Sequence, residues 1–81
     1  MTLEQLGLNY DPKVLHLPHG LEVVGDGWFS GCDIEKVFIP NTVRELGKDA
    51  FNYCLQLYEA VFEPGSQLEI IGNECFSGCD L

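Results

Sequence analysis

The chain has 81 residues, of which 13 are acidic and 4 are basic, so its formal net charge at pH 7 is -9. This length allows one domain at most, and the scarcity of Lys and Arg argues against nucleic acid or an anionic membrane as a partner. With 46% hydrophobic and 11% aromatic residues, the chain is too apolar for a disordered acidic tail. No apolar run approaches the roughly 20 residues of a membrane span, so we expect no membrane insertion.

Residues 1–13 precede the regular pattern and are predicted to form an N-terminal cap or a partial repeat. Thr2 and Gln5 have the spacing of a capping box, which predicts a short helical turn. The segment lacks the charged start and apolar stretch of a signal peptide. Localisation stays open: cytoplasmic if the chain is full-length, cell surface if it is a fragment of a larger protein.

From residue 14 onward, three landmarks recur in the same order. Each time a Gly is followed four residues later by a Phe, and three residues after that by a Cys. The sets are Gly25, Phe29 and Cys32; Gly47, Phe51 and Cys54; Gly72, Phe76 and Cys79. Repetition with a period of 22–25 residues is typical of a solenoid, in which each repeat forms one coil. We therefore interpret residues 14–81 as stacked repeats, the last of them incomplete.

Each repeat predicts two short strands that stack in parallel on those of the next. Residues 15–17, 37–39 and 60–62 bury their first and third side chains, so His16, Phe38 and Val61 between them should point outward. The second segment reads LEVVG, VRELG or LEIIG. It is predicted to bury its first and fourth residues and to turn at a Gly that accepts positive φ. The Phe should fill the core, and the Cys should lie in a tight bend.

The pattern LxxIGxxAFxxCxxLxxVxIP resembles the BspA-like leucine-rich repeats. VRELGKDAFNYCLQLYEAVF, residues 43–62, matches it almost throughout, whereas Cys75 and Trp28 occupy the Ala position in the other two copies. The resemblance implies a mainly β, right-handed solenoid with short parallel strands. It also implies a role in protein–protein contact, often at cell surfaces, and no catalytic residue. The expected function is thus a protein-interaction module, and the alternative is a structural spacer or terminal segment without a binding site.

The cysteines are predicted to be a ladder of buried thiols. Stacking places Cys32, Cys54 and Cys79 about 4.8 Å apart, within reach of a disulfide, but their side chains would point in parallel rather than toward one another. Cys75 should be a small buried residue. Its CxxxC spacing with Cys79 lacks the second ligand pair of a zinc site.

The remaining chemical candidates are weaker. His16 and His19 form an HxxH pair without further ligands, so a solvated pair is the favoured interpretation over a functional one. Neither a phosphate-binding glycine loop nor a calcium motif occurs in the sequence. We therefore expect no catalytic residue, no metal and no cofactor. A small thiol- or metal-dependent protein is the third hypothesis.

Charged residues are predicted to align across neighbouring coils. Glu22, Arg44 and Glu69 should form an acid–base–acid column, and two further pairs are Lys36 with Glu59 and Asp26 with Lys48. Four of the remaining acids are predicted to lie in turns near the Phe and Cys: Asp33, Asp49, Glu74 and Asp80. This acidic edge has two interpretations, a solubilising surface or a surface that prefers basic partners.

The best candidate interaction surface is the outward column His16, Phe38 and Val61, since an exposed Phe beside a Val suggests contact with a protein partner. The competing interpretation is strand propensity, with Phe38 lying flat on its neighbours.

At the C-terminal end of the repeats, FSGCDL stops where a closing strand is expected. This predicts either a fragment of a longer array or self-association through an open C-terminal coil.

Overall fold

The computed structural model describes residues 13–81. The predicted capping box of Thr2 and Gln5 lies outside the described residues, as does nearly all of the predicted cap over residues 1–13.

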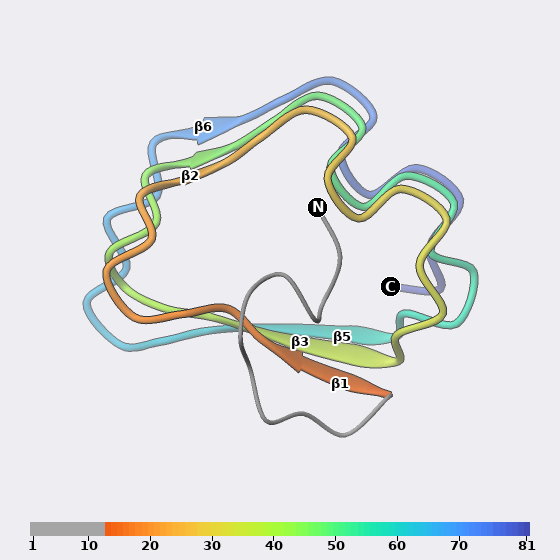
Figure 1. Ribbon diagram of the computed structural model, residues 1–81, viewed down its shortest axis with the longest axis horizontal. Helices are drawn as coiled ribbons and strands as arrows, with labels where there is room; N and C mark the ends of the chain where they lie inside the picture. The colour runs from red at the N-terminus through yellow and green to blue at the C-terminus, as the bar shows by residue number, and fades with distance from the viewer. Residues whose placement is uncertain (1–12) are drawn as a thin grey trace.

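The described residues contain six short strands in two parallel sheets (Figure 1). One sheet has the order β1-β3-β5 and the other β2-β4-β6, so each coil gives one strand to each sheet. The strands are β1 (Val14–His16), β2 (Val23–Val24), β3 (Lys36–Ile39), β4 (Glu45–Leu46), β5 (Glu59–Phe62) and β6 (Ile70–Ile71). The predicted fold class, a mainly β solenoid of short parallel strands, is confirmed.

The register between coils follows the predicted alignment. Leu15 pairs with Val37 and Val37 with Ala60, while His16 pairs with Phe38 and Phe38 with Val61. In the second sheet, Val24 pairs with Leu46 and Leu46 with Ile71. A slip of one residue would turn every side chain to the other face. The shared register therefore puts all inward positions into one core.

That core runs along the stacking axis as columns of equivalent residues. The three repeated phenylalanines form a ladder of parallel rings: Phe29 and Phe51 have centroids 5.3 Å apart, and Phe51 and Phe76 have centroids 5.4 Å apart. Phe51, at the centre, is fully buried. Buried aromatic pairs contribute about 0.5–1.5 kcal/mol beyond their burial, so this ladder holds the coils in register.

The repeated glycines at the end of the second strand are required for a reason other than the predicted one. Gly25, Gly47 and Gly72 do not have positive φ, so the prediction of a left-handed turn there is wrong. A Cβ on Gly47 would lie 2.7 Å from the carbonyl carbon of Gly25, and a Cβ on Gly72 would lie 2.6 Å from that of Gly47. The backbones of successive coils approach so closely that no side chain fits between them.

Positive φ occurs instead at two other positions of each coil. The first is taken by Gly27, Asp49 and Glu74, with φ of 66°, 58° and 58°. The second is taken by Gly31, Tyr53 and Gly78, with φ of 73°, 58° and 78°. A residue with a Cβ is disfavoured in this conformation, so Tyr53, Asp49 and Glu74 are local exceptions to glycine.

The third coil departs from the predicted burial. Val24 and Leu46 are fully buried, but their counterpart Ile71 is 54% exposed. Phe62 is 37% exposed where its counterpart Ile39 is only 2% exposed. Both residues belong to strands at the edge of their sheets. No coil among the described residues lies on their outer side.

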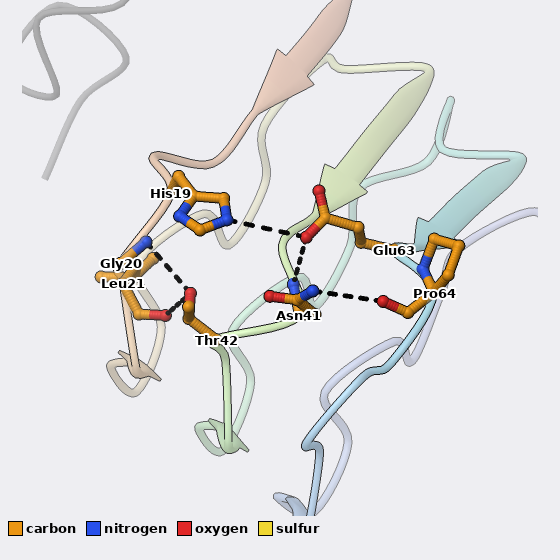
Figure 2. A network of polar contacts seen from close by, with 7 residues as sticks. All are labelled: His19, Gly20, Leu21, Asn41, Thr42, Glu63 and Pro64. Carbon is orange, nitrogen blue, oxygen red and sulfur yellow. Dashed lines mark hydrogen bonds and ion pairs between the residues drawn. The ribbon is translucent and has the colours of Figure 1, made fainter.

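Polar contacts join the turns that follow the first strand of each coil (Figure 2). The Thr42 hydroxyl accepts from the Gly20 N–H at 3.1 Å. The Asn41 N–H donates to the Glu63 carboxylate at 3.1 Å, and the Asn41 side-chain amide donates to the Pro64 carbonyl at 3.2 Å. These bonds run from the middle coil to both neighbours, so they fix the path of the chain where no sheet does.

Candidate interaction surface on the strand face

The predicted column of His16, Phe38 and Val61 lies on the outward face of the first sheet, one residue on each of β1, β3 and β5. The imidazole of His16 stacks on the ring of Phe38, with centroids 4.6 Å apart and an interplanar angle of 8°. His16 is exposed, whereas Phe38 and Val61 are half-buried. The Phe38 ring therefore does lie against a neighbour, and it still presents part of its surface outward.

A pair of opposite charges borders this column. The Nζ atom of Lys36 lies 4.9 Å from the centroid of the Phe38 ring and 3.2 Å from Oε1 of Glu59. Lys36 therefore makes both a cation–π contact and an ion pair. Both charged side chains of the ion pair, Lys36 and Glu59, are partly exposed. The ion pair therefore contributes less than about 1 kcal/mol to stability. Its clearer effect is to hold the lysine over the ring.

The arrangement combines apolar and charged surface in a small area. Phe38 and Val61 supply the apolar part, His16 adds a ring with two polar nitrogens, and Lys36 and Glu59 supply charge. An apolar centre beside polar and charged groups is the usual composition of a protein–protein contact. Chemically, such a face offers stacking, apolar contact and one ion pair to a partner.

The two histidines of the HxxH pair have different neighbours. His16 stacks on Phe38, while Nε2 of His19 lies 3.8 Å from Oε1 of Glu63, and the His19 side chain is 73% exposed (Figure 2).

Among residues 13–81, neither a pocket nor a group of three or more His, Cys, Asp or Glu residues that could hold a metal ion is found. The part of the chain that the structure describes has no helix long and apolar enough to cross a membrane.

All four cysteines are free thiols. The thiol of Cys54 donates to the carbonyl of Phe29 and the thiol of Cys79 to that of Phe51, each at 3.1 Å, so the ladder bonds each coil to the one before. Burial raises the pKa of Cys54 from 9.0 to about 11. Burial is also the main cause of the raised pKa of Cys75 and of Cys79. A protonated thiol is a poor nucleophile and a poor metal ligand.

The predicted charge columns form in part. Nε of Arg44 lies 3.2 Å from Oε1 of Glu22, as expected, but Arg44 meets Glu69 through the backbone, its carbonyl accepting from the Glu69 N–H at 2.8 Å. The Asp26 carboxylate accepts from the backbone N–H of Lys48 at 2.9 Å. At that rung the acid therefore caps a peptide group of the next coil.

Three exposed side chains were missed from the sequence. Tyr53, Leu55 and Tyr58 are 64%, 63% and 55% exposed. Tyr53 directly precedes Cys54, and the other two lie between Cys54 and β5. The alignment of the repeats does indicate that Tyr53 is unusual, since it stands where the other coils have Gly31 and Gly78.

The two parallel sheets, the coil-to-coil register and the ladder of core residues define a leucine-rich-repeat solenoid. A family model described as "BspA type Leucine rich repeat region (6 copies)" matches residues 10–81. The chain therefore belongs to the BspA-type leucine-rich repeat family, as the sequence pattern predicted. This repeat family is generally non-catalytic and typically mediates protein interaction. Comparison with curated proteins gives no significant match, and neither does comparison with solved structures.

Proposed function

We propose that this chain is a protein-interaction module that binds a protein partner through its first sheet, on the column of His16, Phe38 and Val61. The observation that carries the proposal is the outward stack of His16 on Phe38, with Lys36 held over the same ring. Aromatic residues at the centre of a contact contribute most of the binding energy in many interfaces. The family supports protein binding in general, and the residues are our own assignment.

The test is site-specific photocrosslinking from the strand face. A photoreactive amino acid is placed at Val61 and, as a matched control, at Val23, which lies on the outward face of the other sheet and is 41% exposed. The expected result is a specific adduct from position 61 that is absent from position 23. Equal yields from both positions would refute the proposal.

Once a partner is captured, the substitution Phe38→Ser should weaken the affinity of the chain for that partner by about tenfold or more. Since Phe38 is half-buried, this substitution should cost only about 1–2 kcal/mol of folding stability. A loss of several kcal/mol would mean that Phe38 belongs to the core. If no partner depends on Phe38, the alternative of a structural spacer is favoured.

We also propose self-association through the third coil. Phe62, Ile71 and Leu81 are 37%, 54% and 60% exposed at positions whose counterparts in the middle coil are buried. Sedimentation over a range of protein and salt concentrations tests this contact, with Ile71→Lys as the disrupting variant. Because the facing coils would both be acidic, association should strengthen with salt. A monomer under all conditions would refute it.

The thiol- or metal-dependent hypothesis is tested separately. Thiol labelling with mass spectrometry and metal analysis of the purified protein should give four reactive thiols after unfolding and no bound zinc. A bound metal, or a thiol already oxidised in the purified protein, would favour this third hypothesis instead.

A further inference from the structure

One turn of the middle coil exposes three large side chains that the strand-face proposal does not use. Tyr53, Leu55 and Tyr58 lie within six residues and are more than half exposed. We call them the tyrosine turn. In Figure 1 the segment leading into β5 extends further outward than the segment leading into β3. Tyr53 has equivalent residues on both sides, Gly31 and Gly78, so its exposure is not caused by its position in the stack. Tyr58 directly precedes β5, the edge strand of its sheet, so it is covered by a neighbouring coil on one side only.

Tyr53 occupies a backbone position that does not favour it. Its φ is 58°, in the region where the neighbouring coils use Gly31 and Gly78. The ring lies beside Gly78, where an added Cβ would be 2.9 Å from Cδ1 of Tyr53. Glycine would satisfy this backbone with less strain, and the tyrosine side chain is 64% exposed rather than packed in the core. Local strain that folding does not require is a sign of a functional position.

Leu55 belongs to an insertion in the same turn. The first and third coils have a single residue after the ladder cysteine, Asp33 and Asp80, before their next apolar residue. The middle coil has Leu55 and Gln56 there, and Leu55 is 63% exposed. The insertion thus replaces an acid with an exposed apolar side chain in only one coil.

Acidic residues flank the tyrosine turn on both neighbouring coils. The N–H of Tyr58 donates to the carbonyl of Glu35, and the N–H of Asp80 donates to the carbonyl of Leu57, each at 2.9 Å. These bonds place the segments carrying Asp33 and Asp80 beside the turn, and both aspartates are exposed. Between residues 49 and 81 the sequence contains no Lys or Arg. The turn is therefore aromatic at its centre and acidic at its edges.

We propose that the tyrosine turn binds a basic segment of a protein partner, with arginine side chains stacked on Tyr53 and Tyr58 and paired with Asp33 and Asp80. Arginine combines a planar face for tyrosine with a fork of donors for carboxylates. A second copy of this chain does not fit, because a net charge of -9 on each copy opposes contact at an acidic surface. This site lies on a different part of the coil from the strand face and stands or fails independently of it.

The test is an NMR titration of the isotope-labelled full chain with an acetylated, amidated nine-residue peptide of alternating Arg with Gly and Leu. Peptides with Glu or Lys in place of Arg serve as controls. We expect saturable shifts at residues 53–58 and at Asp33 and Asp80 with the Arg peptide, weaker binding with Lys and none with Glu. Binding should weaken with added salt, as for any contact between opposite charges.

Variants separate specific binding from attraction to a negative protein. Tyr53→Gly copies the neighbouring coils, so the double variant Tyr53→Gly/Tyr58→Ser should stay folded and bind about tenfold more weakly. Val23→Ser, on the outward face of the second sheet, is the matched control and should bind normally. Unchanged affinity in the double variant, or shifts spread over all acidic residues, would overturn the proposal. Weakening by Val23→Ser would overturn it as well, because that residue lies outside the tyrosine turn.

Discussion

Replacing Gly47 by Ala should destabilise the solenoid strongly, although its backbone conformation suits alanine. The added Cβ would lie 2.5 Å from Oδ1 of Asp26, 2.6 Å from its backbone nitrogen and 2.7 Å from the carbonyl carbon of Gly25. Favourable contacts between heavy atoms begin at about 3.5 Å. Two of the three atoms belong to the backbone of the preceding coil, so relief requires the coils to separate locally.

The size of the effect follows from what that separation breaks. The Gly47 N–H donates to the Val24 carbonyl at 2.7 Å, and the Lys48 N–H donates to the Asp26 carboxylate at 2.9 Å. Weakening two such bonds costs about 1 kcal/mol each, and overpacking typically costs about 1–3 kcal/mol. We expect a loss of about 3 kcal/mol or more, a large share of the stability of a domain of this size.

Urea unfolding followed by the fluorescence of Trp28, the only tryptophan, measures this loss. The matched control is Gly31→Ala, because Gly31 has φ of 73° and nothing within 4 Å of an added Cβ. It should lose only about 1 kcal/mol from backbone strain. If Gly31→Ala were the more damaging of the two, conformation rather than close approach would govern the repeated glycines, and our explanation would fail.

Three further predictions concern the core. Phe51→Ala should cost about 3–5 kcal/mol in urea unfolding and Phe76→Ala clearly less, because Phe51 is fully buried and Phe76 only partly; equal losses would contradict the ring ladder as described. Burial raises the pKa of Cys54 to about 11, so the unfolded chain releases this proton at lower pH than the folded chain. Stability should therefore fall between pH 9 and 11, by about 2–3 kcal/mol in total from this thiol. Cys54→Ala should remove that part of the pH dependence, and an unchanged slope would argue against a protonated buried thiol. Gly25→Ala should be destabilising because its Cβ meets the Trp28 indole, and Trp28→Ala, which copies Ala50, should recover much of the loss in a double-mutant cycle followed by circular dichroism.

The architecture was predictable because the repeat carries redundant information. Gly, Phe and Cys landmarks fixed the alignment of the coils, and alternation in the first strand then fixed which side chains face inward. Leu15, Val37 and Ile39 are buried as predicted. Each coil has the same pattern of landmark residues, so an irregularity in one copy, such as Trp28 in the Ala position, does not obscure the alignment.

What the sequence did not reveal depends on distances between coils. A glycine needed for positive φ and a glycine needed for close approach look the same in a sequence. The sequence pattern therefore predicts positive φ at Gly47, whereas the structure shows that close approach of the backbones is what requires this glycine. The strain at Tyr53 was also invisible, since only the structure shows that its slot has positive φ in every coil. For the strand face, the pattern gave the outward direction of Phe38 but not the stack on His16 or the position of Lys36.

The net charge of -9 is unevenly divided among the coils, and its division bears on both proposed contacts. Residues 14–35 and 59–81 contain four and five acids and no Lys or Arg, whereas residues 36–58 contain three bases and two acids. The bases of the middle coil contact the first coil through Arg44 and the third through Lys36. A coil that is slightly basic thus lies between two acidic ones, which favours contact between neighbouring coils. Any further surface placed against the first or third coil meets acid that these bases do not neutralise, so a basic protein partner is favoured over another copy wherever salt is low.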